Sequence, residues 1–296
     1  MISLDIKDLS AVQIQQWLGY VVAPRPICFA STIDKNGNVN LSPYSFFNIF
    51  SSNPPVCVFS PSRRVRDNTV KHTLENVLEV PEVVINIVNY DMVQQTSLAS
   101  TEYPKGVNEF EKAGFTPIAS SLVRPPRVKE SPVQLECVVT QVISLGDGPG
   151  AGNLVLATVK MIHVNEAVLG ANGMIDQKKM DHVARLGGNW YSRVTPESLF
   201  EVEKPLITLG IGIDALPEHI RLSKILSGNH LGQLGNVEQL PSDDEVKLFE
   251  LEPEIKDILD ATLGDATTRT TQLHLKAVAF LEEGKVEEAW KTLLID

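Results

Sequence analysis

The sequence predicts a mainly β fold, a β-barrel with peripheral helices, followed by a helical C-terminal extension. Many short apolar runs are separated by hairpin signals, which is typical of antiparallel sheets and barrels. Strands do not alternate regularly with long helices, so a doubly wound parallel sheet is disfavoured. The last third of the chain changes to helical periodicity. We therefore expect a barrel domain at 1–196 and an acidic, mostly helical extension at 197–296.

Turn signals separate most of the expected strands. Asn36-Gly37 supplies the positive φ angles that a tight hairpin turn requires. Residues 42–48 are rich in small hydroxyl and aromatic side chains and are expected to form a loop. The strands expected from the apolar runs are 21–33, 39–42, 56–60, 82–88, 133–145 and 153–164.

Helices are expected where a capping residue precedes helical periodicity. Ser10 and Asp91 are the expected N-caps, and Gly19 and Gly114 are expected to end helices. In the first part of the chain these signals predict helices at 10–18, 73–80, 91–100 and 107–113.

The glycine-rich segment 146–152 has the composition of a nucleotide-binding loop. A dinucleotide fingerprint needs a helix after the glycines, with its N-terminus facing the pyrophosphate. Here a strand-like run follows, and Pro149 breaks the glycine spacing. The segment is therefore expected to be a hairpin loop.

The net charge of −11 lies entirely in the last part of the chain. Residues 1–196 carry 17 basic and 17 acidic side chains, whereas residues 197–296 carry 9 and 20. Such an acidic segment repels phosphate backbones, which argues against nucleic acid as a partner. The simplest interpretation is a solvated helical surface.

The extension is expected to contain a helix at 243–263 that ends at Gly264, and a helical hairpin that turns at 283–285. Residues 210–240, rich in glycine and proline, are expected to be irregular. One hairpin is too little for an independent solenoid, so we expect it to pack on the barrel or on a partner subunit.

Composition also bounds the location and the cysteine chemistry. No apolar run is long enough to cross a bilayer, and the N-terminus lacks a signal pattern, so a cytoplasmic protein without a membrane partner is expected. Cys28, Cys57 and Cys137 are odd in number and lie in apolar runs, which predicts buried free thiols. The histidines lack metal-ligand spacing, so no metal site is expected.

Two neighbouring parts of the barrel together fit a cofactor with a planar head and an anionic tail. Ser31-Thr32 and the segment 45–48 place small hydroxyls and aromatic rings where a flat ring could lie. Arg63, Arg64, Arg66 and Lys71 precede Thr73 at a helix start, a combination suited to phosphate. Alternatively, the phenylalanines are core residues and the basic residues a plain surface patch. Flavin mononucleotide (FMN) fits both features.

The motifs, in this order, resemble those of the flavin reductase-like family, whose fold is the FMN-binding split barrel. Relatives in that family include flavoredoxins and the reductase components of two-component monooxygenases. The resemblance covers roughly residues 15–195. It rests on Arg25-Pro26-Ile27, Ser31-Thr32, Asp34, Gly37, 40–48, 54–56, 71–77, 83–87, Glu109-Phe110, 113–115, 131–137 and 185–191.

The resemblance implies a homodimer that binds FMN near the subunit interface. It places the ring and ribityl chain near Thr32 and 45–48, and the phosphate near Lys71 and Thr73. The family has Asp where this chain has His72, which leaves open whether Arg63, Arg66 or Lys71 neutralises the phosphate. The candidate cofactor-binding residues are Ser31, Thr32, Ser45, Phe46, Phe47, Asn48, Ser60, Arg63, Arg66, Lys71, Thr73 and Arg185.

The activity that the resemblance implies is hydride transfer from NAD(P)H to flavin, with a monooxygenase or another electron acceptor as a possible partner. No nicotinamide-binding fingerprint is present, so NAD(P)H is expected to bind transiently. Flavin carries the chemistry, and no catalytic residue is assigned. Two alternatives stay open: a flavoredoxin-like electron carrier without NAD(P)H activity, and a degenerate barrel that acts as a protein-interaction module.

Overall fold

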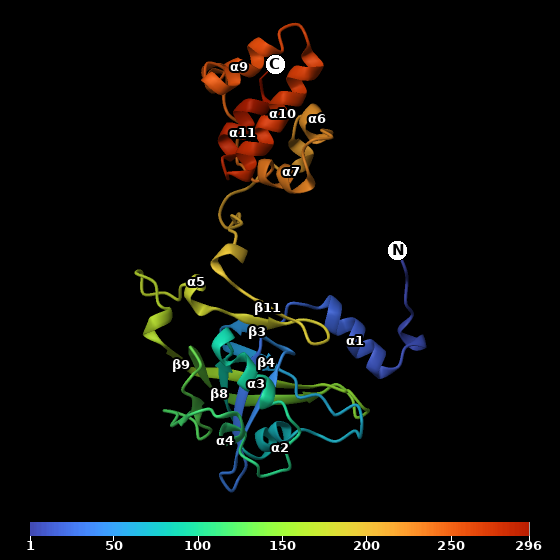
Figure 1. Ribbon diagram of the computed structural model, residues 1–296, viewed down its shortest axis with the longest axis vertical. Coiled ribbons are helices and arrows are strands. Elements are labelled where there is room, and N and C mark those ends of the chain that lie inside the picture. Colours follow the sequence, from blue (N-terminus) through green and yellow to red (C-terminus); the bar gives the residue numbers. More distant parts are fainter. Residues whose placement is uncertain (296) are drawn as a thin grey trace. The chain divides into compact units, whose positions relative to one another are not determined.

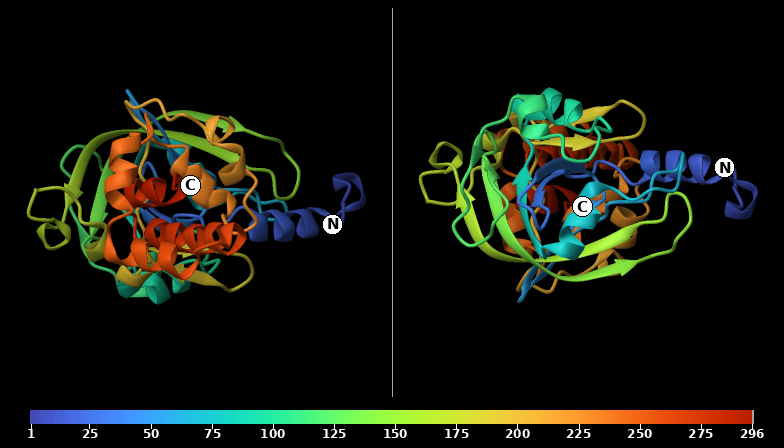
Figure 2. Two further views of the ribbon diagram at one scale, coloured as in Figure 1. Left: turned by 90° about the horizontal axis from the view of Figure 1, so that it is seen from above. Right: turned by 90° about the horizontal axis from the view of Figure 1, so that it is seen from below.

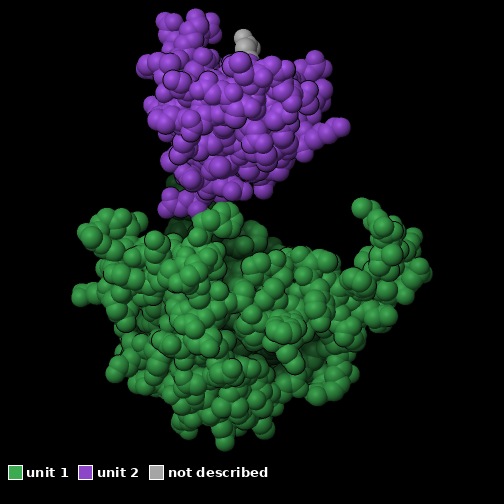
Figure 3. Space-filling model, turned by 45° about the horizontal axis from the view of Figure 1, so that its top comes forward, with its two compact units in different colours: residues 1–200 green, residues 201–296 purple. Residues whose placement is uncertain are grey.

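The computed structural model describes residues 1–295 and divides into two compact units, Met1–Phe200 and Glu201–Asp296 (Figure 3). Each unit has its own hydrophobic clusters.

The first unit is built on one seven-stranded sheet in which every neighbouring pair is antiparallel (Figure 1). The strand order is β2-β1-β5-β8-β9-β4-β3. This confirms the mainly β fold class. The strands are β1 (Cys28–Ile33), β2 (Val39–Tyr44), β3 (Phe47–Ser52), β4 (Pro55–Phe59), β5 (Glu82–Ile87), β8 (Val133–Ser144) and β9 (Asn153–Val164).

The connection between β2 and β3 closes the sheet. These strands form opposite edges of the sheet, yet only Ser45 and Phe46 separate them in sequence. The three Cα–Cα steps from Tyr44 to Phe47 span at most about 11 Å, so the sheet must curl until its two edges meet at this corner. The curvature of the long strands β8 and β9 is visible in Figure 2. The sheet therefore forms the predicted barrel, and the expected hairpins at 34–38 and 146–152 are both present.

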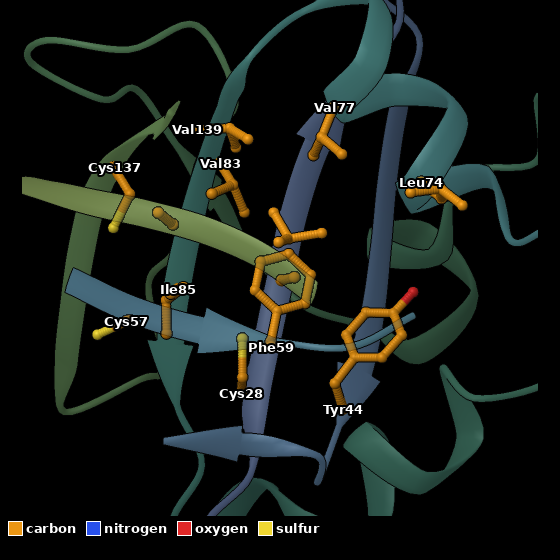
Figure 4. Close-up of a cluster of buried hydrophobic side chains, with 13 residues drawn as sticks. Cys28, Tyr44, Cys57, Phe59, Leu74, Val77, Val83, Ile85, Cys137 and Val139 are labelled. Atoms are coloured by element: carbon orange, nitrogen blue, oxygen red, sulfur yellow. The ribbon is translucent and has the colours of Figure 1, made fainter. Parts of the chain in front are cut away.

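A cluster of buried side chains fills the barrel (Figure 4). The rings of Tyr44 and Phe59 lie 5.4 Å apart at its centre, and Tyr44 directs its hydroxyl toward helix α2 (His72–Glu79). All three cysteines are free and buried in this cluster, as expected from their apolar runs. The complete cluster is Cys28, Ala30, Tyr44, Cys57, Phe59, Leu74, Val77, Val83, Ile85, Cys137, Val139, Val155 and Ala157.

A second cluster lies on the opposite face of β1. There Phe29 packs edge-on against Phe115, and their ring centroids are 5.2 Å apart. Helices α3 (Val93–Leu98) and α4 (Glu109–Ala113) supply side chains to this cluster. Because both of its faces are covered, β1 is buried along its whole length.

Helix α1 (Ala11–Val21) begins with the predicted Ser10 N-cap, which forms a capping box with Gln13. None of its residues is buried. The prediction that Gly19 ends this helix is wrong, because the helical hydrogen bonds continue to Val22 N–H, which donates to Leu18 O. Tyr20, the helical residue after Gly19, packs on Gly187. A Cβ added at Gly187 would lie 2.3 Å from the Tyr20 ring.

Three other local predictions are wrong. Residues 42–48 are not a loop, since β2 runs to Tyr44 and β3 starts at Phe47. Asp91 does not cap a helix but lies within a 3₁₀ turn, Tyr90–Met92, before α3. The expected strand 21–33 is confirmed only over 28–33, because Val21 ends α1 and the segment that follows contains Pro24 and Pro26, which cannot donate to a strand ladder. Strand β3 was not predicted, nor were the small elements β6 (Pro117–Ile118), β7 (Arg127–Val128), α5 (Gln177–Met180), β10 (Val183–Arg185) and β11 (Tyr191–Arg193).

The second unit is helical. Trp290 lies at its centre, is 1% exposed, and donates its indole N–H to Leu234 O at 3.1 Å. The expected helix 243–263 is two helices, because Pro253 begins a new helix at its first position. Residues 210–240 were expected to be irregular, which is wrong for 218–221 and 228–234, because these residues form helices α6 and α7. The helices are α6 (Glu218–Arg221), α7 (Gly228–Leu234), α8 (Asp243–Phe249), α9 (Pro253–Ala261), α10 (Ala266–Glu282) and α11 (Val286–Leu293).

Within residues 1–295, no helix combines the length and apolarity that a membrane crossing requires.

Candidate functional site

The N-terminus of α2 opens into a small polar pocket, here called the Lys71 pocket, with a volume of about 70 Å³. Lys71 is the N-cap residue of α2, and its side chain makes no capping bond. Its ammonium is therefore available to a ligand beside the free N–H groups of the helix. The pocket is lined by Asn40, Ser42, Arg64, Lys71, His72, Thr73, Ser100, Thr101, Glu102, Tyr103 and Glu109.

The Lys71 ammonium is the notable charge of this pocket. It lies 5.1 Å from the centre of the Tyr44 ring, a cation–π contact. Burial lowers the pKa of Lys71 and the neighbouring Arg64 lowers it further, while the Glu102 carboxylate opposes the shift without reversing it. No ion pair of Lys71 is found within the part of the chain that the structure describes. A desolvated cation without a carboxylate partner is costly, and a bound anion would remove that cost.

Thr73 ties the pocket to the barrel. Its hydroxyl oxygen accepts hydrogen bonds from Asn40 Nδ2 at 2.8 Å and from the Tyr44 hydroxyl at 2.7 Å. Burial raises the pKa of Tyr44 to about 12, so this phenol stays protonated and donates. The first turn of α2 is thereby fixed against β2, and Lys71 is held in place by its backbone.

The other charges of the pocket balance one another. Arg64 Nε lies 3.2 Å from the carboxylate of Glu102, which also pairs with Arg66 at 2.8 Å. Glu109 is buried and accepts a hydrogen bond from Leu41 N–H at 3.0 Å; burial raises its pKa. The arginines are thus engaged with a carboxylate, whereas Lys71 is not.

Ser31 and Thr32, the predicted hydroxyl pair, lie on β1 and are fully buried. Thr32 Oγ1 accepts a hydrogen bond from Asn76 Nδ2 of α2 at 3.1 Å. Ser31 points to the opposite face, and its hydroxyl has no hydrogen-bond partner among the described residues. Neither residue lines the Lys71 pocket.

The predicted ring-binding segment forms the corner between β2 and β3. Ser45 is half-buried and Phe46 exposed, whereas Phe47 packs against the barrel core and Asn48 faces solvent. Phe46 O accepts a hydrogen bond from Ser60 N–H, which joins the corner to the end of β4. None of these five residues lines the Lys71 pocket.

Arg25 organises this corner, although the sequence did not single it out as a site residue. Its Nε donates to Ser45 Oγ at 3.4 Å, and its other nitrogens donate to backbone oxygens of Gly19 and Leu186. It also lies 6.0 Å from the Phe46 ring. Arg25 therefore joins α1, the corner and the 185–191 loop. Its presence in the Arg25-Pro26 motif was the available signal.

The basic side chains of 63–71 point to different places in the structure. Arg63 turns to Asn68, donating to its side-chain and backbone oxygens at 2.7 and 2.6 Å. Arg66 is exposed and bonded to carboxylates. Ser60 Oγ accepts from Asn153 N–H at 3.1 Å. Of the candidate cofactor-binding residues, only Lys71 and Thr73 line the Lys71 pocket. Arg64, which belongs to the predicted basic cluster but was not one of those candidates, lines it as well.

Arg185 lies in a different and larger pocket of about 310 Å³, here called the Arg185 pocket. The Arg185 pocket lies between helix α3 and the hairpin formed by β10 and β11. Ser97 lines this pocket and Ser100 lines the Lys71 pocket, so the two pockets flank the C-terminal end of α3. The Arg185 pocket is lined by Tyr90, Val93, Gln94, Ser97, Val183, Arg185, Asn189, Tyr191, Ser192 and Arg193.

Comparison with known proteins identifies the class. The model of the flavin reductase like domain family matches residues 21–184, which is more than half of the chain. The chain therefore belongs to the flavin reductase-like family, and its first unit has the split-barrel fold. Helices α6–α11 lie beyond the matched domain.

Three proteins with known sequences or structures are each similar to 62–68% of this chain. An uncharacterized protein from Aquifex aeolicus is 38% identical over 185 residues, 62% of this chain and 91% of the relative. Nitrilotriacetate monooxygenase component B from Bacillus cereus is similar in structure, with a TM-score of 0.64 and 31% identity over 68% of this chain and 98% of that one. Flavoredoxin of Desulfovibrio vulgaris has a TM-score of 0.52 at 21% identity, over 62% and 91%, and supports the fold alone.

Proposed function

We propose that the chain binds FMN and that the Lys71 pocket receives its phosphate. The observation that carries this proposal is the desolvated, unpaired ammonium of Lys71 at the N-terminus of an eight-residue helix. Thr73, Ser42 and Asn40 add hydroxyl and amide groups to the same pocket. Such a donor set fits a phosphate dianion better than a neutral ligand.

The ring of FMN would be held by the corner of Ser45 and Phe46 and by Arg25. Two grounds support this placement of the ring. The chain belongs to the flavin reductase-like family, and the Phe46 side chain is exposed beside Arg25, so its aromatic face is open to a ligand. Arg25 would position the corner through its bond to Ser45. Arg63 and Arg66 are engaged elsewhere, so we assign the phosphate to Lys71 among the three basic candidates.

The proposed activity is the reduction of flavin by NAD(P)H. When bound, FMN supplies the hydride-accepting chemistry. The chain's own residues bind and orient: Lys71 neutralises the phosphate, Thr73 fixes the helix turn, and Arg25 holds the corner in place. No catalytic side chain is proposed, and the electron acceptor is proposed to be a separate monooxygenase component or another acceptor.

Anaerobic mixing of FMN-loaded protein with NADH or NADPH tests the activity. We expect the visible absorption of oxidised flavin near about 450 nm to bleach with at least one nucleotide. If neither nucleotide bleached the flavin, only the alternative of an electron carrier without NAD(P)H activity would be left. Protein that stays colourless and does not take up added FMN would contradict flavin binding itself.

We further propose that the first unit forms a homodimer through α1 and β3. Most apolar side chains of α1 are exposed in the described part of the chain, with Trp17 and Leu18 about half exposed. Ile49 and Phe50 on the edge strand β3 are 63% and 70% exposed. Such apolar surface is typical of an interface. Light scattering should give twice the 32.5 kDa chain mass; a monomer at micromolar concentration would contradict the proposal.

The chain is proposed to work in the cytoplasm. Its three free, buried cysteines are consistent with a reducing compartment. We also propose that the acidic helical unit, which has its own core around Trp290, is a domain separate from the barrel.

A further inference from the structure

The Arg185 pocket has the size of a site for a one-ring ligand. Its volume of about 310 Å³ compares with the roughly 150 Å³ of a cavity that accepts benzene. The pocket therefore has room for a substituted ring and too little for a whole dinucleotide. Val93 and Val183 provide apolar surface, and Tyr90 and Tyr191 provide aromatic surface.

The two arginines of this pocket differ in how they are compensated. Arg193 makes a two-point ion pair with Asp181, at 2.7 and 2.8 Å, and lies 3.6 Å from the centre of the Tyr90 ring. Its charge is cancelled and its position fixed. Because it is fixed, the Tyr90 ring beneath it is also held as one wall of the pocket.

Arg185 has no such carboxylate in the described part of the chain, residues 1–295. It stacks on Tyr191 at 4.7 Å and donates to backbone oxygens of Trp190 and Gly188. These two bonds hold the guanidinium in place and use only part of its five N–H donors. Its backbone is tied to that of Arg25 by two hydrogen bonds of 3.0 and 2.8 Å. The pocket thus presents a positioned cation with free donors.

The polar residues around Arg185 are neutral donors. Asn189, Ser97, Ser192 and Gln94 line the same pocket, and no acidic side chain does. A guanidinium with free N–H groups binds a carboxylate through two parallel bonds. Tyrosine faces favour a planar partner.

We propose that the Arg185 pocket binds a small aromatic carboxylate, with the carboxylate on Arg185 and the ring against the tyrosines. The site is separate from the Lys71 pocket, and neither Arg25 nor the corner of Ser45 and Phe46 lines it, so the proposed ligand is distinct from FMN. The inference does not depend on the proposed flavin activity. If both hold, the ligand and the FMN phosphate occupy two pockets that both reach the C-terminal end of α3.

Calorimetric titration of the full-length protein with benzoate tests this inference, with benzamide as the neutral analogue. We expect benzoate to bind at least about 10-fold more tightly than benzamide, because the guanidinium prefers a charged acceptor. Arg185→Gln should weaken benzoate binding at least about 10-fold. Arg124→Gln, which removes an exposed arginine paired with Glu82, is the matched control and should change it less than about 2-fold.

A second variant guards against a folding defect in Arg185→Gln. Ser97→Trp adds bulk from an exposed helical position and should also abolish benzoate binding. Equal affinity for benzoate and benzamide, or benzoate binding that survives both substitutions, would overturn the proposal. So would competition between benzoate and FMN. FMN affinity is measured in parallel on the same proteins. A protein that fails to bind FMN but still binds benzoate would contradict the flavin proposal and leave the benzoate site standing.

Discussion

Replacing Glu136 by glutamine is expected to destabilise the barrel unit by about 3–5 kcal/mol, the range for breaking a buried charge network. The side chain is fully buried on β8. Its carboxylate accepts hydrogen bonds from the N–H groups of Ser121, Leu122 and Val123 at 2.7, 2.6 and 3.2 Å, and lies 2.7 Å from His163 Nε2. Glutamine has one acceptor oxygen where the carboxylate has two, so buried donors lose their partners.

Urea unfolding followed by circular dichroism measures this effect as a change in the midpoint. Glu130→Gln is the matched control, because Glu130 also accepts a backbone N–H, that of Thr116, but is exposed. It should change stability by less than about 1 kcal/mol. Equal effects of the two substitutions would show that the Glu136 network contributes little.

The Glu136 effect should also depend on pH. Burial by itself raises the pKa of Glu136, but its hydrogen bonds to Ser121 and Leu122 and its contact with His163 outweigh burial and hold the pKa below the ordinary value. A lowered folded-state pKa contributes stability that is complete above the unfolded pKa, about 4.5, and is lost as the pH falls through the folded value. The difference between wild type and Glu136→Gln should therefore shrink in acid.

Local sequence signals predicted the elements whose residues face a core. The segments 82–88, 133–145 and 153–164 are apolar runs bounded by turns, and all three are strands in the structure. The strand β3 was missed for the opposite reason. Its large side chains Ile49 and Phe50 are exposed, and its first two residues, Phe47 and Asn48, were assigned to the loop expected at 42–48.

The direction of a side chain could not be predicted from its place in the sequence. Arg63, Arg64 and Arg66 are neighbours, yet Arg63 turns to Asn68, Arg64 lines the Lys71 pocket and Arg66 lies exposed on Glu102. Contacts between distant segments decide this outcome. The role of Arg25 escaped prediction for the same reason, since its partner Leu186 is 161 residues away.

Replacing Lys71 by methionine is expected to weaken FMN binding about 30-fold, or about 2 kcal/mol, the value of one charge-assisted hydrogen bond. Methionine keeps the unbranched shape of the lysine side chain as far as Cε and removes the ammonium that lies over the Tyr44 ring. Because Lys71 makes no capping bond with its side chain, the start of α2 should be unchanged. Fluorescence titration with FMN and with riboflavin, which lacks the phosphate, measures the effect.

The two ligands and a control variant together isolate the contact with the phosphate. Riboflavin affinity should change less than about 3-fold in Lys71→Met, since no charged group of the ligand faces the missing ammonium. Lys105→Met removes an exposed lysine that pairs with Glu75 of α2, and should affect both ligands less than about 3-fold. An equal loss for FMN and riboflavin in Lys71→Met would mean that the pocket does not receive the phosphate.

The pH dependence of FMN binding gives an independent check on the same ammonium. Burial lowers the pKa of Lys71, so its charge is lost at a lower pH than that of an ordinary lysine. The charged form exists below this pKa, and FMN affinity should fall as the pH rises through it. Lys71→Met should lack this alkaline decrease, because methionine does not titrate. If wild type and variant lost affinity in parallel at high pH, another group would be responsible, and Lys71 would not be the phosphate ligand.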